Sequence, residues 1–345
     1  MLRAEKVERK AVTVQDVARV AGVSTATVSR ALSDPKKVSE KTRKAVTEAI
    51  SATGYRLNKA ARNLRKRQAN AVLILVPNLG NPFFSQILHG ISAGFSDTEF
   101  SILVSDTSDQ AGNALNLVDY FLDSRIDGLI SLDGSLPNAE LDLFHQHGVA
   151  DKIVFACEWS PEANFPSVRS NNAMGARLAV RHLFDLGHRK IAHVTGPEGN
   201  VLTRARREGM LEERQRLDLP MNPDWIVRGD FSLESGFDAA QKIARMKDRP
   251  TAVFCASDMV AFGLISGLKQ QGLSVPEDIS VVGFDDIEMA EYSDPPLTTI
   301  NQDREGLGRA SADRLLAQLR PDVGEDRQII KLDVYLAERQ STRAI

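Results

Sequence analysis

The sequence predicts an all-α head that contains a helix-turn-helix, joined to a larger α/β domain of two lobes with parallel sheets. Three observations support this fold class. Two short amphipathic segments, separated by a glycine, stand near the N-terminus. From Ala71 onward, apolar runs of strand length alternate with segments of helical spacing, which is typical of βαβ units. This alternation occurs in two sets that divide near residues 160–170, which indicates two lobes.

The helices of the head are predicted from their caps and apolar faces. Thr13, with an acidic residue three positions on, has the spacing of a capping box. Gly22 supplies a tight turn, and Ser24 caps a second helix with the sequence TATVSRAL. A third helix over about 39–54 closes a small core with its apolar residues. These elements place the helix-turn-helix domain at 11–57.

Charge is divided unevenly along the chain. Residues 1–67 carry 17 Lys and Arg against 6 Asp and Glu, whereas the remainder carries 26 against 40. A basic head on an acidic body is typical of a nucleic-acid binder, because Lys and Arg displace counterions from phosphate. A charge run can also be a plain solvated face, so this observation needs the helix-turn-helix beside it.

The second helix of a helix-turn-helix enters the major groove, and only its first turns reach base edges. This selects Thr25, Ala26 and Arg30 as base readers, because Arg binds guanine with two hydrogen bonds and the methyl groups contact thymine. Thr27 and Ser29 are expected to contact phosphate or cap the helix, which sets register without reading sequence. The predicted DNA-contacting residues of the head are Thr13, Ser24, Thr25, Ala26, Thr27, Ser29 and Arg30.

A basic linker follows over residues 58–69. Leu64 is a single large apolar residue within NKAARNLRKR, and Asn58 and Arg62 are assigned to DNA contact with it. A short basic helix with one aliphatic wedge suits insertion into the minor groove, where it kinks the duplex. The alternative is a solvated linker whose leucine rests against the body, and the spacing alone does not choose between them.

The body is assigned to residues 70–345. Ligands of parallel α/β sheets bind at the carboxyl ends of the strands, so two facing lobes share a cleft. An aromatic pair, Phe83 and Phe84, follows the first strand and opens a helix. The expected boundaries are about 70–168 and 299–330 for the first lobe, and about 169–298 and 331–345 for the second.

The head resembles that of the lactose-repressor (LacI/GalR) family nearly residue for residue, through TVQDVARVAGVSTATVSRAL, VSEKTRKAV and GYRLNKAARNLRK. The resemblance implies a transcription regulator whose body has the fold of periplasmic sugar-binding proteins, with three crossings between the lobes. It also implies a homodimer that inserts paired hinge leucines, binds a near-palindromic double-stranded DNA operator and responds to a small effector. A repressor is the expected form of such a regulator.

The resemblance further assigns the effector site. It implies that Arg206 clamps the ligand, Phe231 stacks on it, and Asp285 in GFDD anchors its hydroxyl groups or ring nitrogens. An aromatic pair, an Arg and an Asp converging in a cleft suit a small polar ring. The alternatives are that the phenylalanines belong to the core and that the arginine pairs with a neighbour. The expected effector-binding residues are Phe83, Phe84, Asn171, Arg206, Phe231, Ser257 and Asp285.

Within this family, the segments NPFFSQILHGI, RGDFSLESG, SDPPLTTI and STRAI most resemble the cytidine-repressor branch, which suggests a nucleoside effector. Two sequence differences from these relatives limit how far their ligand contacts apply to this chain. Relatives often have Asp-Asn where this chain has Ser170-Asn171, and the purine-repressor branch has other residues at Asn200 and Leu202. A sugar or polyol effector is therefore the alternative.

Other classes of protein receive little support. The sequence has no GxxxxGK[ST], no GxGxxG after a strand, no HExxH and no GxSxG, so no catalytic residue, cofactor or metal is expected. Cys157 and Cys255 are expected to be buried free thiols in a reducing cytoplasm. A solute-binding protein shares the body fold, but it would need a signal peptide, and the first residues are charged where its apolar core would stand.

Overall fold

The computed structural model describes residues 12–34, 37–55, 68–108, 116–320 and 328–345. The chain divides into two compact units, a head (Met1–Arg67) and a body (Gln68–Ile345). The proposed linker residues Asn58, Arg62 and Leu64 lie outside the described residues. No helix of the described segments is long and apolar enough to cross a membrane.

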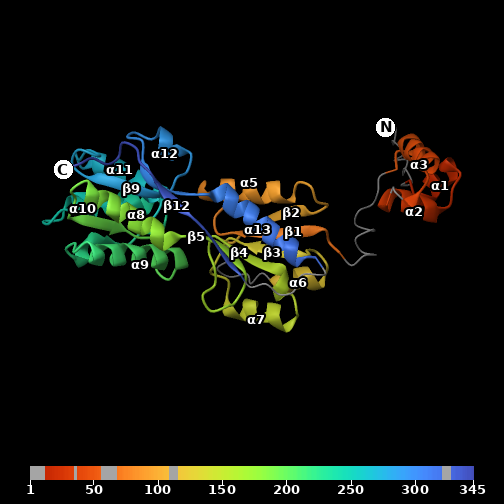
Figure 1. The fold of residues 1–345 in the computed structure, drawn as a ribbon, viewed down its shortest axis with the longest axis horizontal. Helices are drawn as coiled ribbons and strands as arrows, with labels where there is room; N and C mark the ends of the chain where they lie inside the picture. The colour runs from red at the N-terminus through yellow and green to blue at the C-terminus, as the bar shows by residue number, and fades with distance from the viewer. Residues whose placement is uncertain (1–11, 35–36, 56–67, 109–115, 321–327) are drawn as a thin grey trace, which may run out of the picture. The chain divides into compact units, whose positions relative to one another are not determined.

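The described residues of the head form three helices, as the sequence predicts (Figure 1). Its helices are α1 (Val14–Ala21), α2 (Thr25–Ser33) and α3 (Glu40–Thr53). The predicted capping box is present, because the backbone N–H of Thr13 donates to the Asp16 carboxylate at 3.0 Å. Gly22 ends α1 with a φ of 66°, a left-handed conformation that glycine adopts without strain. The core residues are Val17, Ala18, Val28, Ala31, Val46 and Ala49.

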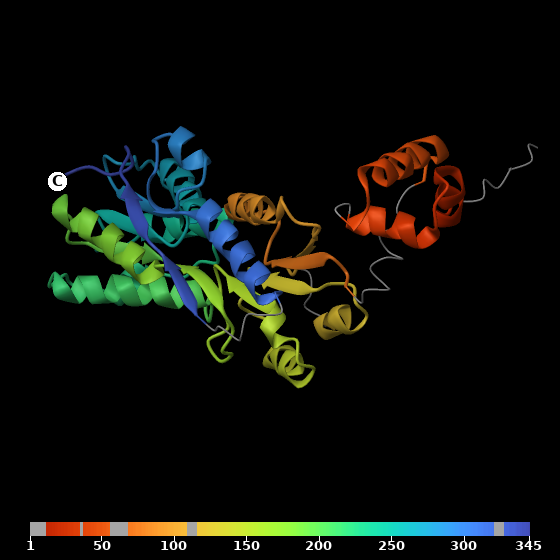
Figure 2. The same cartoon turned by 45° about the vertical axis from the view of Figure 1, so that its right-hand side comes forward.

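The first lobe is built on a six-stranded parallel sheet in the order β11-β5-β4-β3-β1-β2. The strands are β1 (Ala71–Val76), β2 (Ser101–Asp106), β3 (Gly128–Ser131), β4 (Ile153–Ala156), β5 (Ser167–Ser170) and β11 (Ile329–Leu332). The helices of this lobe are α5 (Phe83–Phe95), α6 (Leu117–Leu122), α7 (Asn138–Gln146) and α13 (Arg304–Gln318), with a 3-10 turn at Ala150–Lys152. Figure 2 shows α5 and α13 on the same face of the sheet.

The second lobe repeats this architecture with the order β12-β10-β9-β8-β6-β7. The strands are β6 (Ile191–Val194), β7 (Ile226–Val227), β8 (Ala252–Cys255), β9 (Ser280–Asp285), β10 (Thr298–Gln302) and β12 (Val334–Ala337). The helices are α8 (Asn172–Asp185), α9 (Val201–Arg216), α10 (Leu233–Ala244), α11 (Asp258–Gln270) and α12 (Met289–Tyr292), with a 3-10 turn at Pro223–Trp225. The edge strand β12 is antiparallel to β10, so this sheet is not wholly parallel.

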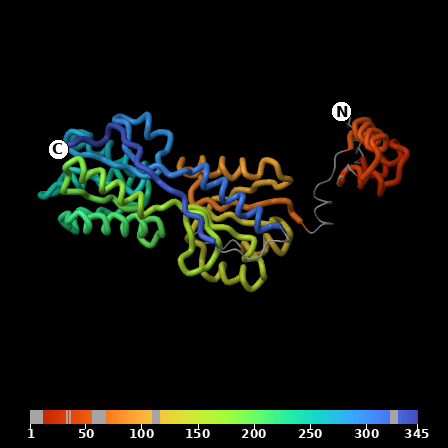
Figure 3. Tube along the Cα trace, viewed as in Figure 1, coloured from red at the N-terminus to blue at the C-terminus, as the bar shows by residue number. Residues whose placement is uncertain are grey.

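The chain crosses between the lobes three times, as the family resemblance implies. It passes from β5 to α8, from β10 to α13, and from β11 to β12, and Figure 3 traces these passages side by side. The return into the first lobe is fixed by close packing of α13 on α5. At Gly90 and Gly308 a Cβ atom would overlap the backbone of the opposing helix, so both positions require glycine.

The parallel strands of both sheets have their carboxyl ends between the lobes. Asp285 and Gln302 are the last residues of two neighbouring parallel strands, β9 and β10. Ser170 ends β5, and Glu158 follows β4 by two positions. This arrangement gathers polar side chains from distant parts of the chain into one site. Both cysteines are buried free thiols, as predicted.

Candidate functional site

The exposed face of α2 carries the residues that the sequence assigns to base reading. Val28 and Ala31 are buried in the head, whereas Thr25, Ala26, Ser29 and Arg30 are exposed. Thr25 and Ser29 are four residues apart, as are Ala26 and Arg30, so each pair lies along one line of the helix. The two lines are adjacent, and together they form one outward surface.

Ser24, the N-cap of α2, and Thr27 define the first turn of the helix. Ser24 accepts a hydrogen bond from the backbone N–H of Thr27 at 3.1 Å, and the two hydroxyl oxygens lie 2.9 Å apart. These contacts fix the N-terminal turn of α2. The turn therefore presents the outward surface in one defined conformation.

The second candidate site lies between the lobes of the body and is centred on Arg206 of α9. The side chain is only 2% exposed. Its Nε donates to the Asn172 side-chain oxygen at 2.8 Å, and a terminal nitrogen donates to the Ala256 carbonyl. Its guanidinium lies 3.8 Å from the ring centre of Phe284 and 5.7 Å from that of Phe231. These contacts hold the guanidinium plane in one orientation.

Asp285 faces this arginine at the end of β9. Its carboxylate lies 3.7 Å from the Arg206 guanidinium and accepts a 2.7 Å hydrogen bond from the Gln302 amide. Burial raises the pKa of Asp285 to about 6, against the opposing effect of Arg206. Beside it, burial and the Asp285 charge raise the pKa of Asp258, whose side chain accepts from the Thr299 hydroxyl at 2.5 Å.

Strained backbone is concentrated at the same place. Cys157, Phe231, Asp285 and Asp286 all have positive φ, at 67°, 69°, 122° and 52°. Side chains other than glycine rarely adopt this region, and such residues gather at ligand sites, where the surrounding structure fixes them. This group of strained residues favours a ligand site between the lobes.

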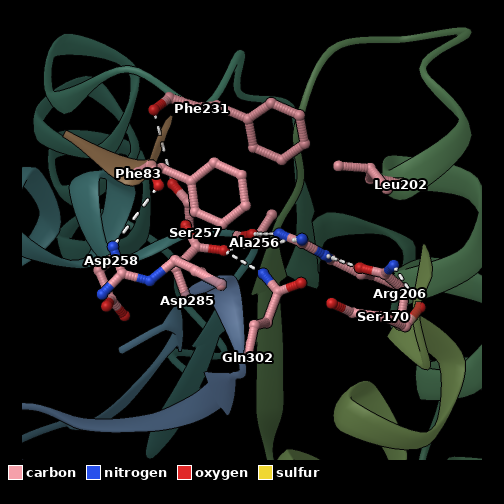
Figure 4. A network of polar contacts seen from close by, with 12 residues as sticks. Phe83, Ser170, Leu202, Arg206, Phe231, Ala256, Ser257, Asp258, Asp285 and Gln302 are labelled. Atoms are coloured by element: carbon pink, nitrogen blue, oxygen red, sulfur yellow. Dashed lines mark hydrogen bonds and ion pairs between the residues drawn. The ribbon is translucent and has the colours of Figure 1, made fainter. Parts of the chain in front are cut away.

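The structure brings most of the predicted effector residues together. Figure 4 shows Phe83, Phe231, Arg206 and Asp285 around one centre, with Ser257 beside them. The Ser257 hydroxyl caps α11 and lies 3.5 Å from the Phe231 carbonyl. Phe83, which comes from the first lobe, is 5% exposed.

Two of the predicted effector-binding residues make other contacts. Phe84 is buried and packs edge-to-face on Phe83, with ring centres 5.1 Å apart. The Asn171 side chain caps α8 by accepting from the Met174 N–H at 3.3 Å, and it is the next residue, Asn172, that contacts the central arginine.

Sequence reasoning missed the residues that connect the lobes. Arg304, 4% exposed, begins α13 of the first lobe and donates to the Asp286 carbonyl of the second lobe at 2.8 Å. It also lies 3.5 Å from the Phe83 carbonyl of its own lobe. The Asn200 amide donates to the Glu158 carboxylate at 2.9 Å, also across the lobes. A carboxylate two positions after the apolar run KIVFA was the available signal for this contact.

The buried carboxyl pair predicts a particular response of stability to pH. Because the pKa of Asp285 is raised to about 6 from 3.8, the folded protein takes up its proton at a higher pH than the unfolded chain does. Stability therefore rises as pH falls from about 7 towards 4, and the pair with Asp258 titrates jointly. Relative to Asp285→Asn, the wild type should gain on the order of 1–3 kcal/mol between pH 7 and pH 4. Chemical denaturation of both proteins across this range measures it, and a constant difference would contradict it.

Two family models match the chain. The model described as bacterial regulatory proteins, lacI family, matches residues 13–58, which span the head. The model described as a periplasmic binding protein-like domain matches residues 180–342 of the body.

Full-length relatives share this organisation. The HTH-type transcriptional repressor CytR of Escherichia coli (strain K12) is 38% identical over 341 residues, which cover 99% of each chain. The crystal structure of the lac repressor dimer bound to operator and the anti-inducer ONPF has a TM-score of 0.86 at 32% identity, covering 97% of this chain and 100% of that one. A LacI family transcriptional regulator from Enterococcus faecium with bound ribose has a TM-score of 0.70 at 28% identity, covering 80% and 99%.

Proposed function

The chain belongs to the lacI family of bacterial regulatory proteins, and from this premise we propose that a nucleoside bound between its lobes controls its affinity for an operator. The protein is a DNA-binding transcription regulator with an effector-binding body. The observation that carries the proposal is the buried Arg206–Asp285 centre with Phe231 beside it.

DNA binding is assigned to the head. A homodimer places two copies of α2 in successive major grooves of a near-palindromic operator. The outward surface of α2 then reads bases through Thr25, Ala26 and Arg30 and contacts phosphate through Ser29. The edge strand β2 offers apolar surface for contact between copies, because Leu103 and Val104 are 43% and 44% exposed. Like its relatives, the protein acts as a repressor in the cytoplasm, without enzymatic activity.

Effector binding and DNA binding are coupled through the lobes. Arg304 and Asn200 each donate a hydrogen bond from one lobe to the other, to the Asp286 carbonyl and the Glu158 carboxylate, so a ligand that alters the separation of the lobes changes these contacts. Ligand affinity and operator affinity then influence each other reciprocally, typically by about 1–3 kcal/mol.

A nucleoside fits the chemistry of the interlobe site. A base is an aromatic ring with hydrogen-bonding edges, which suits the rings of Phe83 and Phe231 and the polar groups of Arg206, Asp285 and Gln302. The resemblance of several segments to the cytidine-repressor branch supports the same class. The ribose bound to the relative from Enterococcus faecium keeps a sugar as the alternative.

The test is a thermal melt of the purified protein with a panel of nucleosides, free bases, pentoses, hexoses and polyols. A ligand at a hundred times its Kd adds about 2.7 kcal/mol of stability, which is an easily visible shift. We expect cytidine or adenosine to raise the melting temperature and to change binding to operator DNA. If sugars or polyols alone raise the melting temperature, the effector is one of them and not a nucleoside.

A further inference from the structure

The chain enters the body through residues 68–71, which we call the entry segment. This segment directly follows the basic residues of the linker, and it leads into β1. β1 is a central strand of the first-lobe sheet, where it lies between β3 and β2 (Figure 1). Every residue of β1 is buried. The entry segment therefore connects the linker to the core of the first lobe.

One carboxylate holds this segment on the β3 side. Asp127, the residue directly before β3, accepts from the backbone N–H of Ala69 at 3.0 Å and from that of Ala71 at 3.4 Å, one at each oxygen. Its own backbone N–H donates to the Ala71 carbonyl at 2.8 Å. Hydrogen bonds to an ionised acceptor are stronger than those between neutral groups. Asp127 thus fixes the backbone of the entry segment at three points.

The β2 side holds the same segment. The Asn70 carbonyl accepts from the backbone N–H of Ser101, the first residue of β2, at 2.8 Å. Asn70 itself has a φ of 48°, in the left-handed region where residues other than glycine are uncommon and Asn is enriched. Such a conformation persists only where the surrounding structure determines it. The backbone between the two N–H groups bound by Asp127 is therefore set in one defined conformation.

This hold extends beyond the part of the chain that the sheet itself orders. The ladder between β1 and β2 begins at Ala71, and the ladder between β1 and β3 begins at Val72. Ala69 precedes both ladders, so its bond to Asp127 orders the chain on the side of the linker. A contact that served β1 alone would not need to reach this residue.

We propose that Asp127 is a positioning residue for operator binding, because its hold on Ala69 and Ala71 fixes the point at which the linker leaves the first lobe. The inference rests on operator binding by the head and does not depend on which effector the body takes. The two heads of a dimer must reach two half-sites at a set spacing. Tethers that start from fixed points restrict the heads before they bind, so less conformational freedom is lost on the operator.

Charge separates this role from an electrostatic one. DNA is a polyanion, so removing the negative Asp127 should, through charge alone, raise affinity for any duplex. Loss of positioning instead lowers affinity for the operator, where both heads bind at a fixed spacing. Binding to an unrelated duplex needs no such spacing and should change little. The two effects on the operator have opposite signs, so the direction of the change identifies the cause.

The experiment compares Asp127→Ala and Asp127→Asn with Glu140→Ala in the full chain, by fluorescence anisotropy at fixed salt. One duplex is selected by the wild type from random near-palindromic sequences, and the other is a scrambled duplex of equal length. Glu140 is the matched control, because it is a first-lobe carboxylate that accepts from the backbone N–H of Leu117 at 2.7 Å, at the start of α6. Its removal takes the same charge from the body and leaves the entry segment intact.

Asp127→Ala should bind the selected duplex at least about tenfold more weakly than the wild type, and the scrambled duplex within about threefold of it. Its affinity for the nucleoside that stabilises the wild type should stay within about twofold. Asp127→Asn retains one acceptor oxygen, so its operator affinity should lie between those of the wild type and Asp127→Ala. Glu140→Ala should keep the wild-type preference for the selected duplex.

Wild-type or higher operator affinity in both Asp127 variants overturns the proposal. A parallel loss of operator and nucleoside affinity with a lower melting temperature also overturns it, since Asp127 would then support folding alone. Should Asp127→Ala fail to fold, Asp127→Asn decides by the same comparison. A wild type that binds no nucleoside overturns the effector class alone, and the operator affinities still decide the role of Asp127. A wild type that selects no duplex overturns operator binding, and this inference with it.

Discussion

Replacing Arg206 by Ala should abolish stabilisation by the effector, with a loss of affinity of at least about a hundredfold. The guanidinium is 2% exposed, and it is held by Asn172, by the Ala256 carbonyl and by the ring of Phe284. Removing it leaves Asp285 buried without its cation, which costs about 3–5 kcal/mol of folding free energy. The measurement is the thermal shift with the stabilising nucleoside, together with denaturation without it.

Two further variants separate binding from folding. Arg206→Lys retains the charge but lacks the planar group that lies on Phe284, so it should fold and still bind the effector poorly. Arg214→Ala removes another buried arginine of α9, which binds the carbonyls of Ile191 and Pro220 in the second lobe. It should lower stability and leave effector affinity unchanged. An Arg206→Lys protein with wild-type affinity would show that the clamp assignment is wrong.

The sequence predicts which strands form this site, because the ends of the strands can be recognised from it. Apolar runs of β-branched residues mark β1, β3, β4, β6, β8 and β9, and the polar residues directly after such runs reach the carboxyl edge of a sheet. Asp285 ends one of these runs, so its place in the site follows from the pattern. The short strands β5 and β11 are interrupted by polar residues, and the structure was needed to find them.

Individual side chains at the site are less predictable. Asn171 and Asn172 are neighbours of the same type, and only helix geometry decides that the first caps α8 while the second contacts Arg206. Glu158 gives no periodic signal, because its role depends on Asn200 from the other lobe. Contacts between segments far apart in the chain depend on register and lobe packing, which local patterns do not encode.

Replacing Arg30 by Ala should weaken operator binding by about tenfold to a hundredfold while changing non-specific binding little. A bidentate contact between Arg and guanine discriminates against other bases by about 1–3 kcal/mol. A phosphate contact would instead weaken binding to all sequences alike and lower its dependence on salt. The exposed position of Arg30 on α2, beside Ala26 and Ser29, favours the first role.

The measurement uses a DNA site selected from random near-palindromic duplexes by the wild type, compared with a scrambled duplex of equal length at fixed salt. Arg43→Ala is the matched control, because Arg43 is an exposed arginine of α3, 3.8 Å from Glu40. Its loss removes the same charge from the head without removing a predicted base reader. We expect the ratio of specific to non-specific affinity to collapse in Arg30→Ala and to persist in Arg43→Ala. Equal losses on both duplexes in Arg30→Ala would assign this side chain to the phosphate backbone, and base reading would then rest on Thr25 and Ala26.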